Sequence, residues 1–596
     1  MLTPDARTVL LDDLRAPTGY TIEHAVATTF TLDLTAAMLP PFAIADIGIT
    51  GRRPDPITLL QALRHASDKV DIFCQAGSIG VPRSEDLVAF LEPMIHQVVP
   101  TRNLFHPKVW VMRFVADDAQ PRYRLLVLSR NLTHDNTWDI AVRLDSESIS
   151  DESLEINAPL VALLRWLPEH VHHIDADRAT RLRSLADDLS HVTWERPADV
   201  ERLSFHVVGL PGHDTLSLHA GRHLVISPFV EDDGLARATH GQQEVPTLIS
   251  RQETLDALSG DALDGVDAYT LAADVDVPTT DETGEDEPDV PLLHGLHAKV
   301  YVLEPTDKWT KARVLLGSSN ATTPGLTGNV EFLVEVTGRR DRLGIDCILP
   351  PDAESRNGLR ALIEPYVRQP PLDHEDERTR RRLQGSLRSI AAIEHLVEIS
   401  DEDTSVDGQT YRATISTCAD YPSTEASVSV ALLTRRASTA DVERRPHLVV
   451  HHLPPADISP CVIVTASEGD ITESTVVLGR LVGAPDSRLD AVIARQIDDP
   501  EKFIRLLMLM LSLGNPSELA ALLAAHRGSG SGSGSLDITT SGVLELVLRG
   551  LSTGGAGIED LDRLITKVLD DDVLPDGFRE FWSQVSQARR LLEDKR

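Results

Sequence analysis

The chain has 596 residues, enough for three or four domains, and its 41% hydrophobic and 25% charged residues are ordinary for a globular protein. A formal net charge of −35 gives it no general attraction to DNA or to anionic membranes, so a nucleic-acid site would be a local basic groove or one that a partner completes. The four cysteines show neither a CxxC spacing nor a Cys/His cluster, which favours reduced thiols over a metal site.

The first residues show no basic segment followed by an apolar one, so we expect no secretory signal. Residues 1–195 then alternate strand-like and helix-like segments, and residues 196–370 repeat that order. Strands are predicted at 21–34, 69–74, 109–112 and 124–128 and again at 223–229, 268–271, 300–303 and 313–316, with helices at 84–91 and 252–259. Leucines at helical spacing between 150 and 200 predict a helical bridge. This alternation predicts the α/β class, with two α/β/α sandwich halves of parallel or mixed sheet related by a pseudo-twofold axis.

Each half carries the same set of polar residues in the same order. The first set is His106-Pro107-Lys108, then Ser129-Arg130-Asn131 and Asp139, and the second is His297-Ala298-Lys299, then Ser318-Ser319-Asn320 and Glu331. The span from His to Asn is 25 residues in the first copy (106 to 131) and 23 in the second (297 to 320). This is an internal repeat.

Each copy has the composition of half a phosphate site. His and Lys two positions apart on a strand point to the same face, and a following strand ends at a Ser/Asn turn where donors converge. Two imidazoles at one phosphate suggest that one attacks phosphorus while the other donates a proton to the departing oxygen. Asp139 and Glu331 would each fix the tautomer of an imidazole, and this chemistry requires no metal ion.

The two motifs resemble the phospholipase D superfamily, whose signature is HxK followed by a G/S-S-x-N turn, present twice per active site. The second copy is the closer match, because it has Gly317 and also Glu304 five residues after its lysine. The first copy departs from the pattern at Leu128 and at Asp117, nine residues after its lysine. Within the superfamily, the Ser129–Leu132 segment followed by Trp138 looks more like tyrosyl-DNA phosphodiesterases and prokaryotic nucleases. The resemblance covers residues 20–370.

The resemblance implies a metal-independent phosphodiesterase that cleaves nucleic acid, DNA in preference to RNA, through a phosphohistidine intermediate and without a cofactor. It assigns the nucleophile to His106 and the acid/base role to His297. The remaining expected site residues are the catalytic Lys108, Asn131, Asp139, Lys299, Asn320 and Glu331 and the phosphate-binding Ser129, Ser318 and Ser319.

By analogy, such a protein would be the nuclease component of a prokaryotic defence or DNA-repair system that works with an ATPase or helicase. Assembly into a homodimer stays open. Two alternatives remain from the sequence: a lipid phosphodiesterase or transphosphatidylase, and a catalytically silent nucleic-acid-binding scaffold. The sequence shows no amphipathic membrane segment, and the first motif keeps its His, Lys, Ser and Asn.

Three further regions follow the second half. Residues 371–408 are predicted to be a linker or helix, 409–485 a β-sandwich-like accessory domain, and 486–596 a helical region. The most apolar run of the chain, residues 506–511, is far shorter than the roughly 20 residues that a membrane span needs, so we expect a soluble, cytoplasmic protein. The Gly-Ser alternation at 528–535 is typical of an engineered linker. An acidic run at 274–289, before the second motif, is predicted to be a solvated insertion or a gate.

Overall fold

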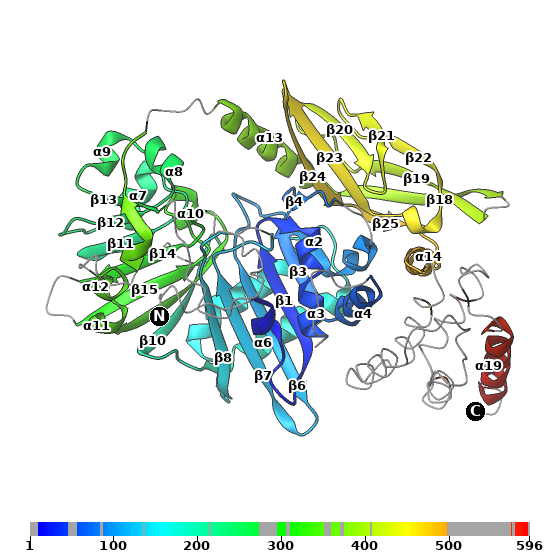
Figure 1. Ribbon diagram of the computed structural model, residues 1–596, viewed down its shortest axis with the longest axis horizontal. Coiled ribbons are helices and arrows are strands. Elements are labelled where there is room, and N and C mark those ends of the chain that lie inside the picture. Colours follow the sequence, from blue (N-terminus) through cyan, green and yellow to red (C-terminus); the bar gives the residue numbers. More distant parts are fainter. Residues whose placement is uncertain are drawn as a thin grey trace, which may run out of the picture.

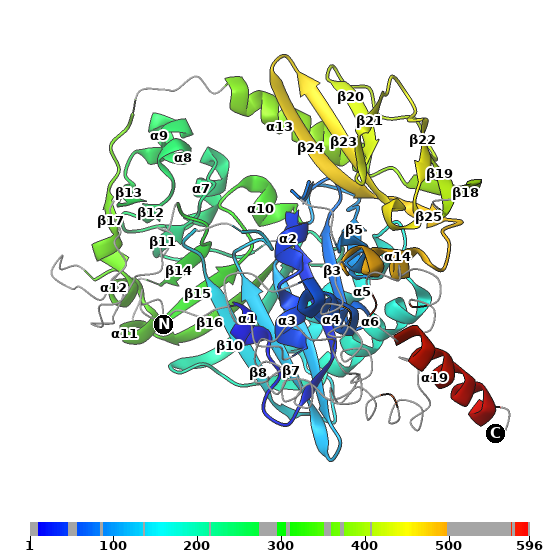
Figure 2. The same cartoon turned by 45° about the vertical axis from the view of Figure 1, so that its right-hand side comes forward.

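The computed structural model describes residues 10–45, 56–83, 87–134, 137–213, 216–272, 295–305, 310–350, 359–369, 375–405, 408–497, 503, 547, 565, 574 and 578–593. It contains two large mixed α/β blocks side by side and a β-rich domain packed above the first of them (Figures 1 and 2). The predicted α/β class with mixed sheets is therefore confirmed for residues 10–369. The acidic run at 274–289 and the Gly-Ser tract at 528–535 lie outside the described residues.

The first block is built on a seven-stranded sheet in the order β5-β3-β1-β6-β7-β8-β9. Its strands are β1 (Thr21–Thr29), β3 (Val70–Gln75), β5 (Ile95–Val98), β6 (Val109–Ala116), β7 (Ala119–Leu128), β8 (Ala141–Ile149) and β9 (Val192–Trp194). Side chains alternate between two cores: Ala25 and Trp110 face α4 (Pro56–Ser67), whereas Val26 and Val111 face α5 (Ala158–Trp166) and α6 (Ala176–Leu189).

The second block is an eight-stranded sheet in the order β10-β16-β15-β14-β11-β12-β13-β17. The strands are β10 (Val200–Val208), β11 (Arg222–Ile226), β12 (Thr247–Ile249), β13 (Asp267–Leu271), β14 (Val300–Glu304), β15 (Lys311–Gly317), β16 (Glu331–Arg339) and β17 (Ile363–Pro365). The helix α8 (Gln252–Ala257) lies where a helix was predicted. Of the helix predicted at 84–91, residues 84–86 lie outside the described residues; the remainder forms a 3₁₀ turn at Val88–Phe90, and Leu87 before it has a left-handed backbone (φ 63°) that an α-helix cannot contain.

Six strands of each sheet follow the same order and the same directions. The run β5-β3-β1-β6-β7-β8 corresponds to β13-β12-β11-β14-β15-β16, with parallel pairs among the first three strands and antiparallel pairs among the rest. One hydrophobic core runs through both blocks and includes Phe105, Phe205 and Phe332. The pseudo-twofold axis that would relate the halves stays a prediction.

The halves are joined at the two histidine motifs. Phe105, which precedes His106, forms a parallel bridge with Val330, and Leu296, which precedes His297, forms one with Trp138. The amide of His106 donates to the carbonyl of Val330 over 2.9 Å, and that of His297 donates to Trp138 over 2.8 Å. Each histidine is therefore anchored by the residue that precedes the carboxylate of the other half.

The accessory domain is a sandwich of two four-stranded sheets, β22-β19-β18-β25 and β21-β20-β23-β24, around one apolar core. Its strands are β18 (His395–Ser405), β19 (Gly408–Thr417), β20 (Ser427–Leu432), β21 (Arg435–Asp441), β22 (Leu448–Leu453), β23 (Cys461–Glu468), β24 (Ile471–Leu478) and β25 (Arg480–Val482). The sandwich begins ahead of the predicted start at 409, and α13 (Glu375–Ala391), within the predicted linker, packs Leu383 and Leu387 into its core.

The accessory domain docks on the first half through polar contacts as well as apolar ones. Arg488 of α14 (Arg488–Arg495) pairs with Glu92 over 2.6 Å, and Thr475 exchanges hydrogen bonds with the backbone of Ile79. Farther along the C-terminal region the described residues include the helix α19 (Phe578–Glu593). No helix among the described residues is long and apolar enough to cross a membrane.

Candidate active site

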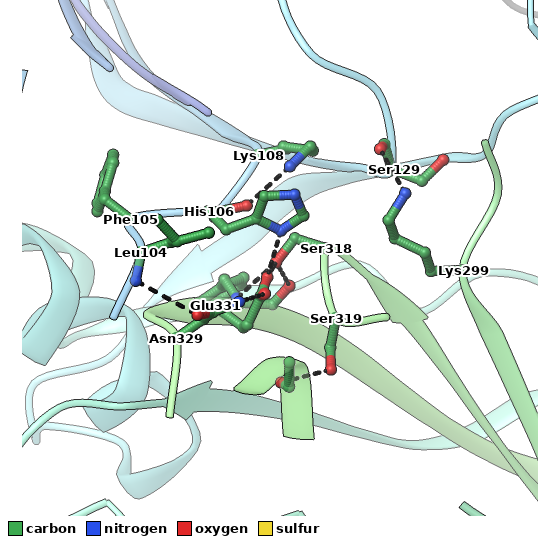
Figure 3. A network of polar contacts seen from close by, with 12 residues as sticks. Leu104, Phe105, His106, Lys108, Ser129, Lys299, Ser318, Ser319, Asn329 and Glu331 are labelled. Atoms are coloured by element: carbon green, nitrogen blue, oxygen red, sulfur yellow. Dashed lines mark hydrogen bonds and ion pairs between the residues drawn. The ribbon is translucent and has the colours of Figure 1, made fainter. Parts of the chain in front are cut away.

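The two lysines of the HxK motifs are buried and fold back over their own histidines. Lys108 is 0% exposed and Lys299 is 1% exposed. The Nζ of Lys108 donates to the carbonyl of His106 over 2.9 Å, and the Nζ of Lys299 donates to that of His297 over 2.7 Å. Lys299 also reaches the carbonyl of Ser129 in the other half, at 3.4 Å (Figure 3). Two buried amino groups thus lie at one junction, where burial lowers the pKa of both lysines, and an anion bound beside them would favour their charged form.

His106 is held by a carboxylate from the second half. Its Nδ1 lies 2.9 Å from Oε2 of Glu331, the first residue of β16, and Glu331 is fully buried (Figure 3). Glu331 also accepts hydrogen bonds from the hydroxyl of Ser318 and, over 3.3 Å, from Nδ2 of Asn329. With Nδ1 donating to Glu331, the lone pair of the ring lies on Nε2, which has no hydrogen-bond partner among the described residues.

The pKa values of this pair follow from burial and from the lysines. Burial, then the charge of Lys108, lower the pKa of His106 to about 4, although Glu331 opposes the shift. Burial raises the pKa of Glu331, but His106 and Lys108 outweigh burial and hold it below its usual range. Burial lowers the pKa of Lys108 to about 7. At neutral pH His106 is therefore a neutral imidazole backed by a carboxylate, which is the form a nucleophile needs.

The second histidine lacks the equivalent carboxylate contact. The Nδ1 of His297 lies 3.4 Å from the Nζ of Lys299, and no hydrogen bond joins it to Asp139 in the described part of the chain. Asp139 instead lies 3.8 Å from the guanidinium of Arg130. Burial and the charges of Lys299 and Lys108 lower the pKa of His297. Glu331 thus contacts an imidazole whereas Asp139 contacts Arg130, and the roles expected of the two carboxylates stay predictions.

The three serines hold the turns and do not face solvent. Ser129, Ser318 and Ser319 are each 0% exposed. The hydroxyl of Ser129 accepts from the amide of Ile140 over 2.9 Å, that of Ser318 accepts from Phe332 over 3.0 Å, and that of Ser319 donates to Gly325 over 2.7 Å. Because these hydroxyls are covered and already bonded, we revise their predicted phosphate-binding role to one of fixing the turns.

The two asparagines differ from the serines. Asn131 lies between β7 and β8, and Asn320 lies between β15 and β16. The side-chain Oδ1 of each is buried and has no hydrogen-bond partner. An unsatisfied buried acceptor is costly and here occurs at both repeated positions. An Oδ1 cannot bind a phosphoryl oxygen, because both atoms only accept, so contact with a phosphate would be made by the Nδ2 of each amide.

The sequence analysis missed a pair of hydroxyls that repeats in the two halves. Thr29, at the end of β1, accepts from the amide of Leu132 over 3.0 Å and donates to the carbonyl of Thr31 over 2.8 Å. Ser227, after β11, accepts from Ala321 over 3.0 Å and donates to Phe229 over 2.7 Å. Each hydroxyl fixes the residue that follows the asparagine. A hydroxyl at the end of β1 and another directly after β11, the strands at matching places in the two sheets, was the available signal.

Glu304 and Asp117, which distinguish the two copies in sequence, lie away from this junction. Glu304 is the last residue of β14, is fully buried, and pairs with Arg222 over 2.6 Å and with Arg340 over 2.8 Å. Asp117 is exposed in the turn between β6 and β7. The difference between Glu304 and Asp117 therefore affects strand ends, whereas Leu128, the other difference, lies at the junction, where its amide donates to the carbonyl of Lys108 over 2.9 Å.

Asp139→Asn is expected to stabilise the empty protein. Burial raises the pKa of Asp139 to about 6, so the folded chain disfavours the ionised carboxyl. For this group, stability is fully present below its ordinary pKa and is lost as the pH rises through about 6. At pH 7 the neutral amide should raise the free energy of unfolding by about 1 to 3 kcal/mol. Urea denaturation at pH 7 and pH 4 would test this, because the gain should nearly vanish at pH 4; a loss of stability at pH 7 would contradict it.

The described residues contain no group of three or more His, Cys, Asp or Glu side chains arranged to hold a metal ion. No family model and no curated protein matches the chain.

Among solved structures the chain is similar to a mutant of yeast tyrosyl-DNA phosphodiesterase, at 12% identity and a TM-score of 0.33, covering 61% of this chain and 95% of that one. A second mutant of yeast tyrosyl-DNA phosphodiesterase 1 matches at 12% identity and a TM-score of 0.33, covering 56% of this chain and 86% of that one. We draw no function from a likeness this distant.

Proposed function

We propose that the chain is a phosphodiesterase of the phospholipase D type that cleaves nucleic acid, DNA in preference to RNA, through a phosphohistidine at His106. One observation carries the proposal: a buried carboxylate of one half, Glu331, holds the imidazole of the other half with its Nε2 unbonded within the described chain, beside two buried lysines. The repeated buried amides of Asn131 and Asn320 support it. A purely structural pair of halves has no need for this arrangement.

In the first step, Nε2 of His106 attacks phosphorus and the bond from phosphorus to the departing oxygen breaks. His297 gives its proton to that oxygen. The imidazolium of the phosphohistidine keeps its proton on Nδ1 and is stabilised by Glu331, 2.9 Å away. In the second step, His297 removes a proton from water, the water oxygen bonds to phosphorus, and the bond from phosphorus to Nε2 breaks. His106 and the protonated His297 are thereby restored.

The lysine charges explain how His297 can act as the acid. In the empty site, burial and the charges of Lys299 and Lys108 lower the pKa of His297. A bound phosphodiester brings a negative charge that offsets those ammonium groups, so binding raises the affinity of His297 for a proton. Lys108, Lys299 and the two asparagine amides then hold the phosphoryl oxygens while charge moves, and this electrostatic work needs no metal ion. Asp139 would turn from Arg130 to His297 in the loaded site.

The wider role rests on the motif resemblance. We propose a cytoplasmic nuclease of a prokaryotic defence or DNA-repair system, with an ATPase or helicase as partner; a homodimer is compatible with this role. The lipid phosphodiesterase and the silent scaffold are the competing functions. The unbonded Nε2 of His106 favours an enzyme over the scaffold.

Cleavage of end-labelled single- and double-stranded DNA and RNA in excess EDTA tests the proposed function. We expect DNA to be cut without added metal. Activity that appears only after Mg²⁺ or Zn²⁺ is restored would contradict the metal-independent mechanism. Hydrolysis of a short-chain phosphatidylcholine, with every nucleic acid intact, would show the lipid enzyme instead. Binding of DNA without cleavage of either substrate would show the scaffold.

A further inference from the structure

One aromatic side chain stands exposed beside the site. Phe229 follows β11 and is 41% exposed, and it is the one phenylalanine among the exposed large hydrophobic side chains of the described residues. The guanidinium of Arg251 lies over its ring, 5.0 Å from the ring centroid. A single exposed apolar residue is ordinary on a protein surface, so the surroundings of this ring decide whether it has a function.

The segment that carries Phe229 is unusually fixed. Its three successive carbonyls each accept a side-chain hydroxyl: Ser250 donates to Ser227 over 2.7 Å, Thr254 donates to Pro228 over 2.8 Å, and Ser227 donates to Phe229 over 2.7 Å. A backbone held at three consecutive positions fixes the point from which the ring projects, and the guanidinium of Arg251 over the ring restrains the side chain further. An aromatic face restrained in this way lowers the entropy cost of stacking another ring on it.

Arg251 connects the ring to the His297 side of the site. Its Nε donates to the carbonyl of Leu296, the residue before His297, over 2.8 Å. Its charge, after burial and the lysine charges, is a further cause that lowers the pKa of His297. Arg251 thus binds the residue next to His297, and Phe229 is linked to that residue through Arg251.

The first half has no such ring at the matching position. Thr31 occupies the position of Phe229, because both carbonyls accept the repeated hydroxyl, from Thr29 and Ser227. An aromatic side chain on that side, Phe30, instead has its ring tilted against the imidazole of His106, with ring centroids 5.2 Å apart. Of these two matching positions, only the one on the His297 side therefore carries an exposed aromatic ring.

We propose that Phe229 and Arg251 form a subsite for the nucleotide on the leaving-group side of the scissile phosphate, with the base stacked on the free face of Phe229. This inference rests on the proposed function and adds the substrate class: nucleic acid with unpaired bases. A base in a duplex already has both faces stacked, whereas a base in a single strand has a face to offer. Arg251 supplies a positive charge for the neighbouring backbone.

The test uses single-stranded oligodeoxynucleotides with one cleavable phosphodiester, the other linkages being phosphorothioates. A stable abasic residue is placed on the leaving-group side, on the retained side, or on neither. For the native chain, we expect KM to rise about tenfold when the leaving-group base is missing and to change little when the retained base is missing. Phe229→Ala should raise KM about tenfold on the complete substrate and add nothing on the substrate that lacks the leaving-group base.

Two further variants separate recognition from folding. Phe229→Trp keeps a stacking face and should retain the native KM. Val245→Ala removes a 57% exposed side chain from the same half and should leave KM unchanged. Suppose that the native chain cleaves but Phe229→Ala raises KM by the same factor on complete and abasic substrates, or does not raise it at all. The subsite is then refuted, while the proposed function stands. If the native chain neither binds nor cleaves any oligonucleotide, the proposed function fails with it.

Discussion

A His297→Ala variant is expected to stop halfway through the reaction and to accumulate protein phosphorylated on His106. Without its acid/base group, turnover on DNA should fall by about 10²- to 10⁴-fold. An ester with a good leaving group, such as a thymidine p-nitrophenyl phosphate, needs no proton from His297. His106, neutral and backed by Glu331 at 2.9 Å, should still attack it, so that a burst of one nitrophenolate per chain precedes slow hydrolysis.

His106→Ala should give neither burst nor labelled protein, and its activity should fall at least as far. The chain offers a matched control, because His206 on β10 also binds a glutamate, with its Nε2 2.9 Å from Oε2 of Glu335. His206→Ala should keep full turnover. Acid-labile, base-stable label on a peptide that contains His106 would identify the nucleophile. Label at His297 in the His106→Ala variant would reverse the two roles.

The sequence predicted the strands that carry the site because those segments are apolar and buried on both faces. The strand Val70–Gln75 is entirely buried, and the composition of such a run is enough to predict a buried strand. The repeated HxK motif also predicted that each histidine precedes a strand. The two strands that follow the motifs, β6 and β14, occupy matching places in the two sheets. These are local patterns, so no contact between distant residues was needed to predict them.

The contacts across the junction could not be predicted from spacing. Both carboxylates follow their motifs at similar places, yet Glu331 binds His106 whereas Asp139 lies near Arg130. Arg130 stands where the second copy has Ser319, and this difference gives Asp139 a competing partner. The serines were misread for a related reason: spacing shows a hydroxyl at a turn, but only the fold shows that Ser129 bonds Ile140.

The start of the accessory domain was hidden by charge. β18 contains the exposed residues Glu398 and Asp401, and these residue types are poor strand formers. Its buried side is carried by Val397 and Ile399, which face the core that α13 covers. The pairing with β19, from His395 to Thr417 onward, overrides local preference. Tertiary contacts decide such strands, and a single sequence does not display them.

Glu331→Gln is expected to reduce kcat by about 10²- to 10⁴-fold with little change in KM. All three partners of Glu331 donate to it: Nδ1 of His106, the hydroxyl of Ser318 and Nδ2 of Asn329. A carboxylate accepts from all of them, whereas an amide has one accepting atom and an NH₂ that must face a donor.

Asn329 cannot turn its amide freely to accommodate the glutamine, because its Oδ1 accepts from the amide of Leu104 over 3.3 Å. The new NH₂ group therefore favours the His106 side. There it binds the lone pair of Nδ1 and shifts the ring proton to Nε2, the atom that must attack. The variant also loses the negative charge that stabilises the phosphohistidine.

Steady-state kinetics on DNA, with thermal unfolding as the measure of folding, would check the Glu331→Gln result. Glu335→Gln is the matched control, since Glu335 lies four residues farther along β16 and also binds a histidine, His206, over 2.9 Å. It should change the unfolding temperature more than kcat, because its partners His206 and Arg313 lie outside the catalytic set. Equal losses of kcat in both variants would mean that Glu331 acts through the stability of β16. The proposal that Glu331 activates His106 would then be contradicted.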